Sequence, residues 1–282
     1  MKESTKQILN YLNKGYTMID VSKILNISYK TVESIKRRYK VDVNKVSQSK
    51  ANYHFLEIID NDIKAYILGF FIADGCIGKE GRFSFNISKE DEYILHKIKD
   101  CFIANSVVYK NNQNGVKFRK EQAIYRFTSR PLLSILEKKY NIHPRKTYNS
   151  SFQFPFKTIP TKYHGSFIRG LWDGDGCYES YKSIFNPSCC INSKLFAEQI
   201  GNIIKNNTGL DYKIYEHQGK TCKYYVLRLH ANRINKLEKI RKLYNFLYSE
   251  DTISLKRKKD KVIRYLEYRA NLAVNKAKQC KA

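Results

Sequence analysis

The sequence predicts an α+β chain in which two pseudo-symmetric αββαββα repeats follow a small all-α unit. Three observations lead to this prediction: apolar residues at helical spacing in about the first forty residues, an internal repeat in the rest of the chain, and segments of alternating polarity in both copies. With 282 residues, 42% of them apolar, the chain is long enough for two or three units with real cores. This composition argues against a disordered chain.

The N-terminal segment, residues 1–46, has the pattern of three short helices joined by tight turns. Ser28 precedes the third helix, where its hydroxyl can accept from a free amide one turn in. Short helices with a basic last helix resemble a helix-turn-helix DNA reader, although a plain three-helix bundle with a solvated basic face has the same pattern. The apolar stripes are Ile8, Leu9 and Leu12; Val21, Ile24 and Leu25; Val32, Ile35 and Tyr39. The expected DNA contacts are Tyr29, Lys30, Thr31 and Ser34 at bases, and Lys36 and Arg37 nearer phosphates.

An internal repeat follows a polar linker at residues 47–60. The segment ILGFFIADGC at 67–76 has a partner, IRGLWDGDGC, at 168–177, and the aspartates Asp74 and Asp175 are 101 residues apart. Similar segments, FNISK at 85–89 and CINSK at 190–194, each open a helical pattern. One copy therefore reads helix, two strands, helix, two strands, helix. The boundaries are 61–152 for repeat one, 153–164 for a stiff linker, and 165–282 for repeat two with a basic C-terminal helix.

An apolar helix that ends in Asp-Gly occurs once in each copy. Gly69 and Gly170 remove side chains where two such helices can pack backbone to backbone, and the glycine after each aspartate is expected to adopt a left-handed turn. Asp74 and Asp175 would then emerge side by side. Two carboxylates this close, next to a polyanion, repel each other unless cations lie between them. A divalent metal with oxygen ligands, Mg²⁺ first, satisfies this arrangement.

Charge and composition indicate what kind of partner the protein binds and where in the cell it is found. The chain has 52 Lys and Arg against 26 Asp and Glu, a net charge of +26, which indicates a polyanion such as nucleic acid. An A/T-rich genome would also raise the Lys content, but it does not explain why acids stay at half the base count. The sequence has no signal peptide, no apolar run of roughly 20 residues and no zinc spacing among its cysteines. We expect a soluble, intracellular protein that is not secreted and has no membrane partner.

The two motifs resemble those of the LAGLIDADG homing endonucleases in their single-chain form, over about residues 60–260. This resemblance implies two curved sheets in the major groove of double-stranded DNA and a monomer that hydrolyses both strands at a long asymmetric site, leaving 3′ overhangs. It implies Asp74 and Asp175 as catalytic acids and metal ligands, with the carbonyls of Ala73 and Gly174 beside them, and Mg²⁺ as the metal, for which Mn²⁺ is expected to substitute. Asp173 occupies the earlier Asp position of the family motif, from which Ile72 departs.

The same resemblance implies a lysine near each active centre. Lys146 matches the Lys-Thr segment that ends repeat one, whereas the corresponding stretch of repeat two departs from it, and Lys256 is chosen over Lys258. For each of these candidate lysines, the alternative to a catalytic role is a simple contact with a DNA phosphate. Trp172 is expected in the core. The strand residues expected to face the groove are Arg82, Lys117, Arg119, Arg126, Tyr212, Lys213, Tyr215, Lys223 and Arg228.

Two functional readings follow from these residues. The first is a site-specific endonuclease of a mobile element, intron-encoded or free-standing. The second is a binding protein, either a LAGLIDADG intron maturase that binds intron RNA or a WhiA-like regulator with degenerate motifs. Both aspartates are intact, which favours cleavage. The helix-turn-helix pattern precedes the repeats here, whereas it follows them in WhiA-type chains.

Overall fold

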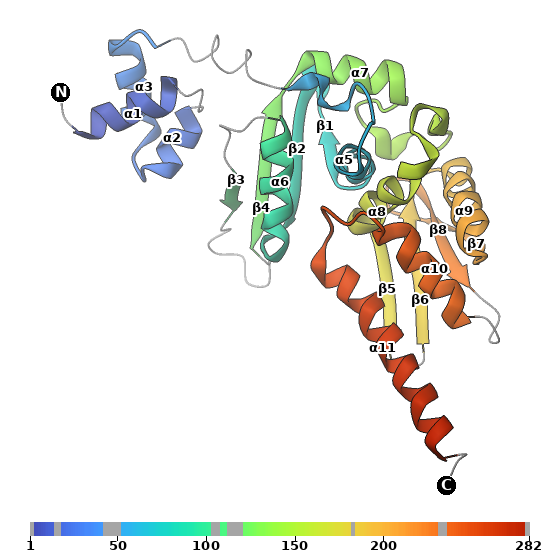
Figure 1. The fold of residues 1–282 in the computed structure, drawn as a ribbon. Coiled ribbons are helices and arrows are strands. Elements are labelled where there is room, and N and C mark those ends of the chain that lie inside the picture. Colours follow the sequence, from blue (N-terminus) through green and yellow to red (C-terminus); the bar gives the residue numbers. More distant parts are fainter. Residues whose placement is uncertain are drawn as a thin grey trace. The chain divides into compact units, whose positions relative to one another are not determined.

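The computed structural model describes residues 3–13, 18–41, 52–102, 108–111, 121–181, 184–230 and 236–279. The chain packs as two compact units, one formed by Met1–Glu57 with Gly78–Leu133 and the other by Ile58–Ile77 with Ser134–Ala282. The second unit therefore contains the motif helices of both repeats. Figure 1 labels the elements.

Three helices form the N-terminal part of the first unit, at the positions that the apolar spacing predicts. They are α1 (Glu3–Asn13), α2 (Met18–Ile24) and α3 (Tyr29–Arg38). Their shared core is built by Ile8, Leu12, Val21 and Val32. The three helices thus bury their apolar side chains against one another, as a small helical bundle must.

The details of α2 and α3 differ in part from the predicted pattern. Ser28 caps α3 as predicted, and its hydroxyl accepts from the amide of Thr31 at 3.1 Å. Ile24 and Tyr39, however, are exposed. Ile24 is the last residue of the seven-residue α2, and Tyr39 follows the end of α3, so neither side chain stays on the core-facing stripe.

Repeat one has the predicted order of helices and strands, and its sheet has the strand order β1-β2-β4-β3. Strands β2 and β4 pair antiparallel with Ser84 opposite Arg126, and β3 pairs with the other edge of β4. Helix α6 packs on β2, β3 and β4. The elements are α5 (Asp62–Ala73), β1 (Gly75–Ile77), β2 (Arg82–Ser88), α6 (Glu92–Phe102), β3 (Val108–Asn111), β4 (Gln122–Thr128) and α7 (Arg130–Tyr140).

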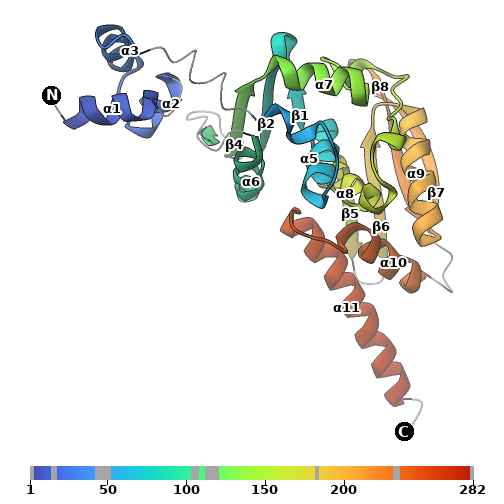
Figure 2. The same ribbon diagram turned by 45° about the horizontal axis from the view of Figure 1, so that its top comes forward.

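Repeat two has the equivalent elements and the equivalent strand order, β5-β6-β8-β7. Helix α9 covers β7 and β8 on one face of this sheet, and α11 packs on β5 (Figures 1 and 2). The predicted duplication of an α+β fold is therefore confirmed. The elements are α8 (His164–Asp175), β5 (Gly176–Tyr181), β6 (Ile184–Ile191), α9 (Lys194–Thr208), β7 (Asp211–Gln218), β8 (Lys223–His230), α10 (Lys236–Tyr248) and α11 (Lys256–Gln279).

The glycine after each motif aspartate does not adopt the predicted left-handed turn. Gly176 has φ −85° and continues directly into β5, and Gly75 is not among the positive-φ residues either. A Cβ at Gly75 would stand 2.5 Å from the carbonyl oxygen of Phe71, and one at Gly176 would meet the Trp172 ring. Each glycine therefore makes room for the residue four positions earlier in its motif helix.

The motif helix α8 is buried along most of its length. Trp172 is only 1% exposed, which confirms its predicted place in the core. Its ring stacks near Tyr178, and the aromatic series continues through Phe185 to Tyr265 of α11. None of the helices described here is long and apolar enough to cross a membrane.

Candidate active centre

The two motif helices α5 and α8 pack against each other through their glycines. A Cβ at Gly69 would overlap the carbonyl oxygen of Phe167, and a Cβ at Gly170 would overlap that of Tyr66. The two contacts are reciprocal, since each glycine faces the same motif position of the other helix. Absence of both side chains lets the helix backbones touch.

This packing brings the C-terminal ends of the helices together. A Cβ at Gly174 would lie against Ala73 and 3.3 Å from the carboxylate oxygen Oδ2 of Asp74. Asp74 caps α5, and Asp175 is the last residue of α8. One carboxylate from each repeat therefore lies at a shared helix junction.

The electrostatics of Asp175 reflect this proximity. Desolvation by the surrounding chain and the negative charge of Asp74 raise the pKa of Asp175 to about 6, while the ammonium groups of Lys146 and Lys258 act in the opposite direction. The residue as a whole is nevertheless exposed to solvent. A crowded carboxylate of an exposed residue can accept a cation that arrives from solvent.

Two lysines place ammonium groups at the helix ends. The Nζ of Lys146 donates to the carbonyl oxygens of Ile72 and Ala73, the latter at 3.1 Å. In repeat two, the Nζ of Lys258 donates to the carbonyls of residues 172, 173, 174 and 176 at 2.9, 2.5, 3.2 and 2.6 Å. Burial lowers the pKa of both lysines, and nearby carboxylates partly offset this effect.

The second lysine is not the one chosen from the sequence. Lys256 is exposed, whereas Lys258 is only 6% exposed and lies against the end of α8. Both belong to the first turn of α11, and residues two apart in a helix point in different directions. The position equivalent to Lys146 is therefore that of Lys258.

The residues at the junction fit a hard divalent cation. The oxygens available are the carboxylates of Asp74 and Asp175 and the carbonyls of Ala73 and Gly174, which also accept from the lysines. Within the described part of the chain, no group of three or more His, Cys, Asp or Glu side chains could hold a metal. Two carboxylates completed by water and phosphate oxygens are the kind of set that Mg²⁺ uses when it binds beside a phosphate substrate.

Asp173 has a role that the motif alone does not indicate. Its Oδ2 accepts from the Leu255 amide at 2.6 Å and from the Tyr66 hydroxyl at 3.0 Å, and the side chain is buried. Burial raises the pKa of Asp173 to about 7, against the effect of these donors. Asp173 thus joins both motif helices to the start of α11.

The open sheet faces carry part of the predicted DNA contacts. In repeat two, Lys213 and Arg228 are opposite each other on exposed positions, and the Arg228 guanidinium lies 5.6 Å from the centre of the Tyr215 ring. Arg82 and Arg126 are exposed on the corresponding face of repeat one. Lys117 and Arg119 lie outside the described residues.

Two predicted groove residues do not lie on this face. Lys223 and Arg228 are five residues apart on β8, so their side chains are on opposite faces of the sheet. The Lys223 ammonium group pairs with the Glu216 carboxylate at 2.6 Å. The ring of Tyr212 packs against Gly201 of α9, and its hydroxyl donates to Asn202 at 2.8 Å. Strand register decides the face, and a shift of one residue is not visible in the sequence.

The residues predicted on α3 are largely available to solvent. Lys36 is half-buried, and the exposed ones are Tyr29, Lys30, Thr31, Ser34 and Arg37.

Fold and centre together define a duplicated α+β protein in which paired helices bring one carboxylate from each repeat to a common junction. Residues 162–244 match the family described as the LAGLIDADG-like domain. This match covers most of the second repeat, which therefore contains a LAGLIDADG-like domain. A search of curated proteins found no match.

Several solved structures align with the chain. The structure of I-DmoI in complex with DNA and Ca is 15% identical, with 65% of this chain and 90% of that one covered and a TM-score of 0.42. The homing endonuclease I-WcaI bound to its DNA recognition sequence is 13% identical, with 78% and 92% covered and a TM-score of 0.48. Full-length DUF199/WhiA from Thermatoga maritima is 14% identical, with 81% and 71% covered and a TM-score of 0.45.

Proposed function

We propose that the chain is a site-specific double-strand DNA endonuclease that depends on a divalent cation, Mg²⁺ with Mn²⁺ as a substitute, and leaves 3′ overhangs. One observation carries the proposal: Asp74 and Asp175 meet at the ends of two touching helices, each end bearing a lysine ammonium group. A purely structural helix junction gains nothing from two adjacent carboxylates, one of which has a raised pKa.

The proposed reaction is phosphodiester hydrolysis. The oxygen of a water molecule bonds to phosphorus, the bond from phosphorus to the 3′ oxygen breaks, and the products carry a 5′ phosphate and a 3′ hydroxyl. The carboxylates would hold the cation, which supplies charge stabilisation and water activation when bound. The ammonium groups of Lys146 and Lys258 would help to offset the negative charge that develops on the phosphate oxygens.

The charge of the chain supports DNA as the substrate. A net charge of +26 favours a polyanion, and Arg82, Arg126, Lys213 and Arg228 lie on the open faces of the two sheets. The exposed residues of α3 would extend the contacted site in the manner of a helix-turn-helix. The DNA contacts of the two sheet faces and those of α3 both belong to the proposal.

Cleavage of selected duplexes tests the proposal. Duplexes bound by the protein in Ca²⁺ would be enriched from a randomised library and then incubated with Mg²⁺. We expect double-strand cuts by the wild-type chain and none by the Asp74→Asn, Asp175→Asn double variant, which should still bind. Asp91→Asn, at a buried carboxylate of the other compact unit, is the matched control. Binding without cleavage by the wild-type chain would instead support the maturase or WhiA-like reading, and an RNA-splicing assay would then separate these two.

A further inference from the structure

Lys146 lies on a short 3-10 turn, η4 (Lys146–Tyr148), that one side chain holds at both ends. The Nδ2 of Asn192 donates to the carbonyl oxygen of Lys146 at 2.7 Å and to that of Asn149 at 3.1 Å. Arg145, directly before the turn, has φ 60°, which is unfavourable for a residue with a side chain. The turn therefore depends on contacts from outside itself, and Asn192 supplies them from repeat two.

The contact of Asn192 belongs to a longer junction. The hydroxyl of Ser193 donates to the carbonyl of Phe152 at 2.7 Å. The amide of Gln199 pairs with the backbone N–H and C=O of Phe154 at 3.0 and 2.9 Å. The start of α9 in repeat two thus fixes the segment that carries the lysine of repeat one.

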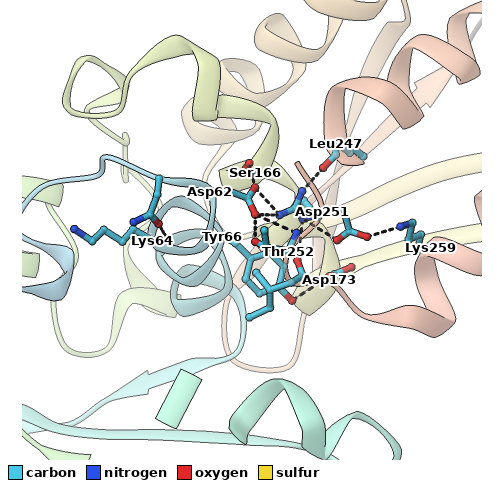
Figure 3. Close-up of polar contacts among 12 residues, drawn as sticks. Asp62, Lys64, Tyr66, Ser166, Asp173, Leu247, Asp251, Thr252 and Lys259 are labelled. Atoms are coloured by element: carbon cyan, nitrogen blue, oxygen red, sulfur yellow. Dashed lines mark hydrogen bonds and ion pairs between the residues drawn. The ribbon is translucent and has the colours of Figure 1, made fainter. Parts of the chain in front are cut away.

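Lys258 is held by a different set of residues, centred on Asp62 at the start of α5. Asp62 is only 4% exposed and accepts from Arg169 Nη2 at 2.7 and 2.9 Å. It also accepts from the hydroxyl of Ser166 and from the amide and hydroxyl of Thr252. Figure 3 shows Ser166 and Thr252 facing this carboxylate from two different elements.

Arg169 extends this contact into the connection between α10 and α11. Its Nε donates to the carbonyl of Ile253 at 3.0 Å and its Nη1 to that of Leu247 at 2.6 Å. The connection then ends at the Leu255 amide, which donates to Asp173, and α11 begins at the next residue. The direction of the first turn of α11, and with it the position of Lys258, is therefore set by Asp62 and Arg169.

We propose that Asn192 is the positioning residue for Lys146 and that the buried pair Asp62 and Arg169 positions Lys258. Each support includes one residue of the opposite repeat, Asn192 for Lys146 and Asp62 for Lys258, and the two supports share no residue. Loss of one support impairs one strand-cleaving step and leaves the other intact. The strand-resolved part of this inference rests on the proposed endonuclease function.

The first experiment uses Asn192→Asp, which keeps the size of the side chain but replaces the donating amide by an acceptor. With a selected duplex labelled differently on its two strands, we expect cleavage of one strand to slow by about 10- to 100-fold, the same strand that Lys146→Met affects. The Kd for the duplex should not change. Asn207→Asp is the matched control, because its exposed amide also donates to a carbonyl but lies at the other end of α9.

The second experiment uses Asp62→Asn and the milder Thr252→Val, which removes one donor to Asp62 and keeps the side-chain volume. Both should slow the other strand, the one that Lys258→Met affects, with Asp62→Asn the stronger. Asp91→Asn again controls for loss of a buried carboxylate. Equal slowing of both strands by a variant whose circular dichroism and DNA affinity are those of the wild type would overturn the inference.

Lysine acylation of the free protein, read by mass spectrometry, tests the inference without cleavage. We expect Lys146 to react faster in Asn192→Asp and Lys258 to react faster in Asp62→Asn, each without a change at the other lysine. Unchanged reactivity at both lysines would contradict the positioning roles. If the wild-type chain cleaves no duplex, the proposed function fails, whereas the acylation pattern still decides whether these residues position the lysines.

Discussion

At the scale of single residues, Asp175 combines a crowded carboxyl with exposure to solvent. Its pKa is raised to about 6 from 3.8 by desolvation and by Asp74, so the folded chain binds more protons than the unfolded chain between these values. Stability contributed by this group therefore decreases as pH rises through this window, and the full cost is present above about pH 6. A bound cation would remove the repulsion that causes part of this cost.

Asp175→Asn should therefore raise the melting temperature of the metal-free protein above about pH 6 and abolish cleavage. The gain should disappear below about pH 3.8, where the carboxyl is mostly protonated in both states. Differential scanning fluorimetry in the presence of a chelator, across this range, measures it. A melting temperature that is lower than that of the wild type at every pH would show that Asp175 has a stabilising role instead. The raised pKa of Asp175 also predicts how cleavage depends on pH. Because a protonated carboxyl cannot bind the cation, cleavage by the wild-type chain should fall as pH drops below about 6.

Arg169 is a buried charge that is paired with Asp62 and 1% exposed. Replacing it by Met leaves the Asp62 carboxylate buried without its cation, and we expect unfolding to become easier by about 3–5 kcal/mol. Urea unfolding of Arg169→Met and of Arg241→Met, an exposed arginine of α10, gives the comparison. A loss that is equal in the two variants would mean that the buried Asp62–Arg169 pair does not stabilise the fold.

The residues of the centre were predictable to different degrees. Asp74 and Asp175 follow from a motif that occurs twice, because the Asp-Gly ending and the helical glycine are local patterns. Lys258 was not predicted, because the direction of the α11 start depends on the bond from the Leu255 amide to Asp173, 82 residues away in the sequence. Asp62 and Arg169 lie 107 residues apart, and nothing in either local sequence indicates their pairing.

At the scale of elements, the α5–α8 pair has almost no space at its glycines. In Gly69→Ala, the added Cβ would overlap the carbonyl oxygen of Phe167, and the helices must separate. We expect a loss of about 3 kcal/mol, at the upper end of what overpacking costs, together with loss of cleavage. Gly78→Ala is the control, since its Cβ would have an ordinary contact at 3.4 Å. Thermal and urea unfolding should separate the two variants clearly.

Helix α3 is the element that we expect to add DNA contacts. Replacing Lys30, Lys36 and Arg37 by Gln should weaken binding to all duplexes and reduce the slope of log affinity against log salt by about 0.9 for each phosphate that the protein no longer neutralises. Fluorescence anisotropy at several salt concentrations measures this slope. Equivalent substitutions at Arg130, Lys138 and Lys139 of α7 remove the same number of charges and serve as a control for total charge. A slope equal to that of the wild type would show that α3 does not bind phosphates.

The elements themselves were largely predictable, because the repeat fixes their order and the apolar spacing fixes their type. The exceptions are positions where a tertiary contact decides the conformation. Gly75 and Gly176 were predicted as left-handed turns, but each instead makes room for Phe71 or Trp172. Tyr212 and Lys223 were placed on the wrong face, since strand register is set by pairing and not by composition.

At the scale of the whole molecule, both carboxylates belong to the second compact unit of one chain. The proposed nuclease therefore needs no second copy to assemble its centre, and we expect one chain per duplex. Sedimentation of the protein with a selected duplex should give the mass of a single chain plus DNA. A complex with two chains, together with cleavage that depends on protein concentration above saturation, would contradict this stoichiometry.

The pairing of Asp62 with Arg169 makes the two repeats chemically unequal, because neither residue has an equivalent in the other repeat. At the 101-residue offset of the repeat, Tyr163 occupies the place of Asp62, and Leu68 occupies that of Arg169. A symmetric dimer of two second halves would thus bury two Arg169 guanidinium groups without the Asp62 carboxylate that pairs with Arg169 in this chain, at a cost of several kcal/mol for each. The two halves therefore carry different members of one ion pair, and we expect a chain built from two second halves to close its helix junction less stably than this chain does.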